Sequence, residues 1–119
     1  MTLRRLVVEP NEGTTRYTST LLLEGRRYEF TAYTAKIRGE HWCFDLADAD
    51  GRLIVTGDTL AVGVDLVGRY RYREVPPGIL FVGRTDGAGR DPRPGEFLDG
   101  LAELYYLTSD DPLIGEGVP

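Results

Sequence analysis

Regularly spaced glycines restrict this chain to short secondary-structure elements. The first four stand at positions 13, 25, 39 and 51, so about 12 to 14 residues separate one from the next. The runs between them are rich in β-branched and aromatic residues, a pattern typical of short antiparallel strands. The sequence therefore predicts a mainly β fold, a small single-domain antiparallel β-sandwich or partly open barrel, with at most one or two short helical turns.

Alternation and turn residues locate the predicted elements. Tyr28, Phe30 and Ala32 share one face of a strand, and the Asp-rich segment 48–51 supplies side-chain acceptors and a glycine for a turn. We expect strands at residues 17–24, 27–35, 40–47, 52–56, 59–62, 79–85 and 101–108, with the first hairpin turn at Gly25-Arg26. We also expect a helical turn at 65–69, an extended stretch at 70–75, a surface loop at 86–95 and a short turn at 96–100. The apolar residues of 96–108 also follow helical spacing, so a helix there stays open as the alternative.

One predicted strand carries the most strongly apolar face in the chain. Trp42, Phe44 and Leu46 occupy alternate positions there, so all three point to the same side of the sheet. We predict that these three side chains lie in the core.

The length of the chain suits one domain. Its 119 residues lie within the roughly 100–200 that a single core supports, and we expect residues 1–108 to form one β domain. Residues 109–119 lack periodicity, so we expect an exposed acidic tail or an arm that reaches a neighbour. No apolar run approaches the ~18 residues that cross a bilayer, so we expect no membrane contact. The single cysteine excludes an internal disulfide, which suits a reducing cytoplasm.

The balance of charges disfavours one class of partner. A formal net charge of −5 and a pI near 4.8 argue against binding to nucleic acid, which depends on Lys and Arg to neutralise phosphates. Of the 14 basic residues all but Lys36 are Arg, whose planar and weakly hydrated guanidinium suits protein interfaces. The composition therefore favours protein partners.

Three side chains on one predicted strand, His41, Cys43 and Asp45, give the sharpest chemical alternative. They could hold a metal ion or form a Cys-His pair. Alternate residues of a strand lie roughly 6.8 Å apart, so the three side chains do not converge on one ion unaided. The chain also has no second histidine. We therefore expect a solvent-facing or interface-facing strand surface there.

Two glycine-containing segments fall short of ligand-binding motifs. A calcium loop aligned on Asp48 and Asp50 would need a bidentate Glu where Gly57 stands. The glycines of segment 87–89 are followed by prolines where a phosphate-binding helix would begin. The sequence predicts no cofactor, no metal and no catalytic residue.

A segment of alternating arginines and tyrosines is the main interface candidate. It comprises Arg69, Tyr70, Arg71, Tyr72 and Arg73. In an extended conformation its three guanidiniums share one face and its two rings share the other. Three interpretations stay open: rings in the core with arginines paired to carboxylates, a protein interface, or stacking on nucleic acid, which the acidic net charge disfavours.

Several segments follow one another in a recognisable order: HWCFDLADADG, LIVTG, DLVGRYRYREVPPG, ILFV, GAGRDP and LAELYYL. In this order, over about residues 21–108, they resemble the phage baseplate plug family. The resemblance implies a virion component near the hub of a tail baseplate, closing the tail tube before ejection and assembled in the cytoplasm of the bacterial host. It implies contacts with other tail baseplate proteins, such as hub, tube or spike components, and with copies of itself, and it implies no catalytic residues.

Two other classes of protein also fit the sequence. A carbohydrate- or protein-binding β module would use exposed rings such as Tyr33, Tyr70 or Tyr106 as stacking platforms. A hydrolase would use His41 or a pair of carboxylates and would need a deep polar pocket.

Overall fold

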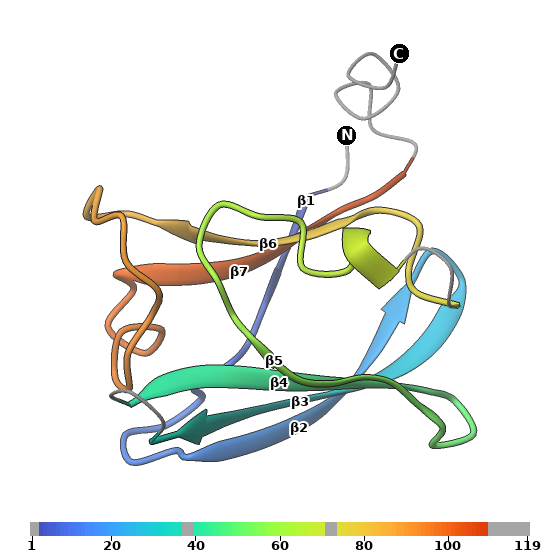
Figure 1. Cartoon of the computed structure of the whole chain (residues 1–119), viewed down its shortest axis with the longest axis horizontal. Coiled ribbons are helices and arrows are strands. Elements are labelled where there is room, and N and C mark those ends of the chain that lie inside the picture. The colour runs from blue at the N-terminus through green and yellow to red at the C-terminus, as the bar shows by residue number, and fades with distance from the viewer. Residues whose placement is uncertain (1–2, 37–39, 71–73, 110–119) are drawn as a thin grey trace.

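The computed structural model describes residues 3–36, 40–70 and 74–109 and contains two β-sheets, one above the other in Figure 1. The elements are β1 (Leu3–Leu6), β2 (Arg16–Leu23), β3 (Arg26–Ala35), β4 (His41–Asp48), β5 (Leu53–Thr59), the 3-10 turn η1 (Gly68–Tyr70), β6 (Ile79–Arg84) and β7 (Ala102–Leu107). The first sheet has the order β1-β7-β6 and the second β2-β3-β4-β5, and neighbouring strands within each sheet are antiparallel. The sheets do not close into a barrel, so the mainly β prediction is confirmed in its two-sheet form.

The first hairpin turns one residue earlier than predicted. Leu23 pairs with Arg26, which leaves Glu24 and Gly25 as the two turn residues. Both have positive φ, 53° and 80°. A two-residue turn with two positive φ values matches the twist of the flanking strands, and Glu24 adopts it although glycine and asparagine are favoured there.

The Asp-rich turn between β4 and β5 forms as expected. Asp48 Oδ1 accepts hydrogen bonds from the backbone N–H groups of Asp50 and Arg52, both at 2.9 Å. Gly51 supplies a φ of 81°. Side-chain bonding of this kind stabilises the turn without help from the core.

β5 is longer than predicted, and the separate strand expected at residues 59–62 is wrong. β5 continues to Thr59 because the β4–β5 pairing shifts register near Asp45 and admits Gly57, whose φ is 63°. Asp45 Oδ1 accepts the Gly57 N–H at 2.8 Å, which holds this irregular stretch. Such a bulge bends a strand while keeping it in its sheet.

The chain after β5 crosses to the other sheet. Val62 forms an isolated parallel bridge with Val82 of β6, and the N–H of Leu66 donates to the carbonyl of Leu80 at 2.7 Å. This segment therefore lies along the outer edge of β6. The helical turn expected at 65–69 is found slightly later, as η1.

β1 is a strand that the sequence did not predict. It pairs with β7, from Leu3 opposite Leu107 to Leu6 opposite Leu104. The short LRRL run shows no alternation, and its partner lies at the far end of the chain. The expected strand at the C-terminal end is confirmed as β7, preceded by a turn.

The core lies between the two sheets. Trp42 and Phe44 are fully buried and Leu46 is 1% exposed, and the rings of Phe30 and Phe44 stack with centroids 5.7 Å apart. The facing sheet contributes Leu80, Val82, Leu104 and Tyr106. Side chains from both inner faces thus interdigitate, as in other two-layer β proteins.

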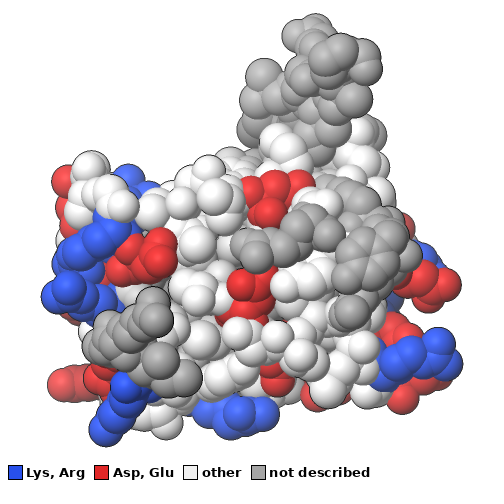
Figure 2. Space-filling view, viewed as in Figure 1, with Lys and Arg blue, Asp and Glu red and all other residues white. Residues whose placement is uncertain are grey.

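Charged groups are spread over the surface. In the face shown in Figure 2, basic side chains lie mostly around the rim, whereas acidic side chains also lie near the centre. No helix in the described part of the chain is long and apolar enough to span a membrane.

Candidate functional site

Only part of the arginine–tyrosine segment can be placed. Tyr70 ends η1, packs half-buried against the core, and donates its hydroxyl to Asp58 Oδ2 at 2.9 Å. Arg71, Tyr72 and Arg73 lie outside the described residues, as does the side chain of Arg69. The expected extended stretch therefore does not begin at Tyr70, and the role of this segment as an interface stays a prediction.

The strand face of His41, Cys43 and Asp45 is occupied by structural contacts. Asp45 Oδ1 accepts the Tyr33 hydroxyl at 3.1 Å in addition to the Gly57 N–H. Cys43 is 6% exposed, and burial, followed by the nearby carboxylates, raises the pKa of its thiol. A thiol with a raised pKa is a weak nucleophile at neutral pH.

A wide groove of about 1270 Å³ borders this face, with Tyr33, His41, Cys43, Arg90 and Arg93 among its lining residues. Within the described ranges, no three His, Cys, Asp or Glu side chains come together as metal ligands would. Burial, together with Asp45, raises the pKa of Tyr33 to about 12, so this phenol stays neutral. The groove therefore offers hydrogen bonding and charge, and its tyrosine and cysteine are neutral at pH 7.

The rings named as sugar platforms are mostly covered. Tyr106 is fully buried, which contradicts its proposed role as an exposed stacking surface. The guanidinium of Arg16 lies 5.4 Å above the ring of Tyr33. Tyr70 is half-buried, because it packs on the core. These three rings therefore do not form an open platform for carbohydrate.

A buried ionic cluster anchors the Gly- and Pro-rich loop at residues 86–95. Glu96 accepts two hydrogen bonds from Arg84, at 3.1 and 3.0 Å, and two from Arg90, at 2.8 and 2.6 Å. Arg84 also bonds both oxygens of Asp86, at 2.9 and 2.8 Å. The Arg84 side chain is 2% exposed and that of Glu96 is 10% exposed. The loop has no regular structure, as predicted, but its two ends are tied together.

These contacts stabilise the charged form of the acid. The hydrogen bonds from Arg84, then those from Arg90, lower the pKa of Glu96 from 4.5 to about 2. The guanidinium of Arg84 also lowers the pKa of Asp86. Two arginines face two carboxylates, so the cluster is neutral overall, as a buried group of charges must be to offset its desolvation.

A second buried carboxylate holds the same region from the other side. Glu9 is 7% exposed and accepts the backbone N–H groups of Gly95, at 3.0 and 2.9 Å, and of Phe97, at 3.0 Å. A carboxylate bonded to backbone donors replaces the water those donors would otherwise need. The turn before β7 is therefore fastened to the N-terminal part of the chain.

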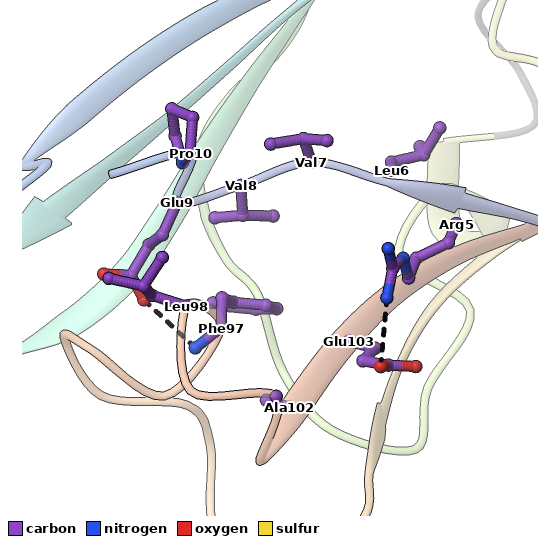
Figure 3. Close-up of a pocket in the computed structure, with 11 residues that line it drawn as sticks. Arg5, Leu6, Val7, Val8, Glu9, Pro10, Phe97, Leu98, Ala102 and Glu103 are labelled. Carbon is purple, nitrogen blue, oxygen red and sulfur yellow. Dashed lines mark hydrogen bonds and ion pairs between the residues drawn. The ribbon is translucent and has the colours of Figure 1, made fainter. Parts of the chain in front are cut away.

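A hollow of about 420 Å³ lies between the chain that follows β1 and this turn, and Figure 3 shows the residues that line it. One end is bounded by the Arg5–Glu103 ion pair at 3.5 Å, and the other by the bond from Phe97 to Glu9. Val8 and Ala102 are buried beside it. The hollow can accept an apolar side chain, but the charged groups at its ends are already engaged with each other or with backbone.

A third set of polar contacts joins the two sheets. The buried Tyr106 hydroxyl donates to Glu24 in the β2–β3 turn and accepts the N–H of Gly78 at 2.7 Å. Burial, followed by the bond to Glu24, raises the pKa of Tyr106. Glu24 also accepts the N–H of Ser109 at 3.0 Å. The positive φ of Glu24 thus accompanies a carboxylate that bridges the first hairpin and the end of β7.

Residues 8–110 of this chain match the protein family described as cyanophage baseplate Pam3 plug gp18. No curated protein matches the chain.

Proposed function

Because the chain belongs to this baseplate plug family and is a structural component of a phage tail baseplate, we propose that it closes the lumen of the tail tube near the baseplate hub before ejection. The family match over residues 8–110 carries this proposal. The hydrogen bonds that hold the 86–95 loop and those that join the two sheets support it, because a plug must keep its shape while neighbouring proteins press against it.

We further propose that the chain acts by assembly and not by catalysis. Its partners would be hub, tube or spike components and copies of itself, met during assembly in the host cytoplasm. The engaged carboxylates and the raised pKa of the Cys43 thiol support a role without turnover. Catalytic turnover by the purified protein would contradict this part of the proposal.

A phage that lacks the chain tests the proposal directly. We expect its tails to lose infectivity, and we expect a plasmid-borne copy of the chain to restore it. A reconstruction of the restored tails should show density for this two-sheet domain on the tube axis. Density at the periphery of the baseplate, with an open lumen, would overturn the plugging role while leaving the chain a baseplate component.

The arginines at positions 69, 71 and 73 are the interface that the sequence proposes. We expect Arg71→Glu to lower incorporation into tails, because guanidiniums bind carboxylates of a neighbour and a reversed charge repels them. The thermal melt of the free protein should change little, since an exposed charge contributes about 0–1 kcal/mol. Arg27→Glu, on the exposed surface of β3, is the matched control. Normal incorporation of a triple reversal at 69, 71 and 73 would exclude these arginines from the interface.

A further inference from the structure

The outer face of the three-stranded sheet is unusually apolar. The alternate side chains Leu80, Val82 and Leu104 point into the core, where each is at most 2% exposed. Their neighbours along β6 and β7 therefore point outward. The outward apolar side chains of this sheet are Leu3, Ile79, Phe81, Tyr105 and Leu107.

The register gathers these side chains into one patch, which we call the outer face of β1-β7-β6. Leu107 lies between Leu3 and Ile79 on the two neighbouring strands. Tyr105 pairs with Phe81, and their ring centroids are 5.5 Å apart. Leu3 is 43% exposed. One row of apolar side chains thus runs across all three strands, and the adjacent row continues on β7 and β6 and ends at Arg5 on β1.

The charges on this face cancel. Arg5 and Glu103 project on the same side as the patch and form an ion pair at 3.5 Å. A surface without net charge can be covered by an uncharged partner without stripping water from an unpaired ion. The partner surface that fits is therefore apolar.

The other sheet gives a direct comparison within the same molecule. The outer side of β2 and β3 carries the polar side chains Thr18, Thr20, Arg27 and Glu29 beside one exposed leucine, Leu22. Antiparallel sheets that meet water on one side normally alternate in this way, apolar inward and polar outward. The outer face of β1-β7-β6 breaks that rule, as strands that are covered on both sides do.

We propose that another baseplate protein covers the outer face of β1-β7-β6 with an apolar surface of aliphatic and aromatic side chains. This inference rests on the assignment of the chain to the baseplate. The outer face of β1-β7-β6 shares no residue with the arginine–tyrosine segment.

The size of the face decides between such a partner and a second copy of the chain. Three strands about 4.8 Å apart and six residues at about 3.4 Å each cover roughly 300 Å². A stable dimer buries about 800 Å² on each partner. The net charge of −5 also opposes the approach of an identical chain. The face is therefore one part of a larger contact, as expected for a small protein set among others.

The test uses the phage that lacks the chain, supplied with variants from a plasmid. Phe81→Glu places an unpaired charge on the outer face, and we expect its content in purified tails to fall at least tenfold. Thr20→Glu adds the same charge to the exposed side of β2 and should be incorporated normally. If Phe81→Glu does not fold, Phe81→Thr and Leu107→Thr keep the strand propensity and should still lower incorporation.

The other possible results distinguish failure of the docking face, failure of the proposed function and a different occupant of the face. Normal incorporation of Phe81→Glu into tails that need the chain would overturn the docking face and leave the proposed function intact. Infectious tails formed without any copy of the chain would instead overturn the proposed function. A wild-type dimer at micromolar concentration that Phe81→Glu converts to a monomer would identify a second copy as the occupant. Stronger binding of a hydrophobic dye after removal of residues 110–119 would identify the chain's own C-terminal residues as the cover.

Discussion

At the scale of single residues, Trp42, the largest side chain of the core, is held by apolar packing more than by hydrogen bonds. The ring of Trp42 meets the ring of Phe97 edge-on, with centroids 6.0 Å apart and an interplanar angle of 84°. Its Nε1 is buried and has no hydrogen-bond partner among the described residues. The contribution of this residue therefore comes from apolar contact and from the space it fills.

Replacing this ring tests its place in the core. Trp42→Ala should lower the free energy of unfolding by about 3–5 kcal/mol, because it removes buried surface and leaves a cavity. Chemical denaturation of the two proteins measures the difference. A loss below about 1 kcal/mol would mean that neighbouring side chains collapse into the space or that the ring lies elsewhere.

The alternation of apolar and polar residues along β4 was enough to predict which of its side chains are buried. Alternation does not predict which charged residues are buried. Glu9 and Glu96 look like ordinary surface residues in the sequence, since each stands in or beside a segment rich in Gly and Pro. Glu9 bonds to a backbone N–H group 86 residues later, and Glu96 bonds to arginines 6 and 12 residues earlier, so no strand or helix periodicity predicts either contact. The apolar runs ILFV and LYYL do indicate strands that are apolar on both faces, because a strand with one face in water would alternate between apolar and polar residues.

At the scale of elements, hairpins could be predicted and long-range pairing could not. The turn residues around Gly25 and Gly51 mark two hairpins whose strands are adjacent in sequence. β1 has no such mark, because its partner β7 follows about 100 residues later and only the completed fold brings them together. The crossover after β5 was misassigned for the same reason, since its contacts are with β6.

One glycine shows how closely the elements approach. A Cβ at Gly78 would lie 2.6 Å from the Tyr106 hydroxyl and would overlap the carbonyl oxygen of Leu107. Gly78→Ala should therefore cost about 2–3 kcal/mol, because backbone has to shift. Gly89→Ala is the matched control: a Cβ there meets nothing within 4 Å, and we expect a change within about 0.5 kcal/mol. Similar melting temperatures for the two variants would contradict the close approach of β6 and β7.

At the scale of the whole molecule, stability should depend on acid through the ionic cluster. The pKa of Glu96 falls from 4.5 to about 2 on folding. A carboxyl whose pKa is lowered by folding stabilises the protein fully above its unfolded pKa, and this stabilisation is lost as the pH falls toward the folded pKa. The cluster thus contributes at neutral pH and fades between about pH 4.5 and pH 2.

Glu96→Gln measures that contribution. At pH 7 the variant should be less stable than the wild type by about 3 kcal/mol, because Arg84 and Arg90 lose a shared partner in a largely buried position. At pH 2.5 the gap should shrink, because this pH lies well below the unfolded pKa of 4.5 and only just above the folded pKa of about 2, so most of the stabilisation linked to ionisation is lost. Asp99→Asn, at an exposed position, should show a small gap at both pH values. An undiminished gap at pH 2.5 would show that the size of the side chain matters here and its charge does not.

The pairing of the first strand with the last one also determines how the fold responds to force. β1 and β7 are antiparallel, so Leu3 and Leu107 lie opposite each other at the same end of the sheet. The hydrogen bonds between antiparallel strands run perpendicular to the strands. A pull that separates the two ends of the chain therefore loads these bonds one after another, beginning at Leu3 and Leu107, and the strands peel apart as a zipper does. A load spread over the sheet faces would act on all the β1–β7 residue pairs at once and not on one pair after another. The domain therefore resists pressure from its neighbours better than tension through its termini.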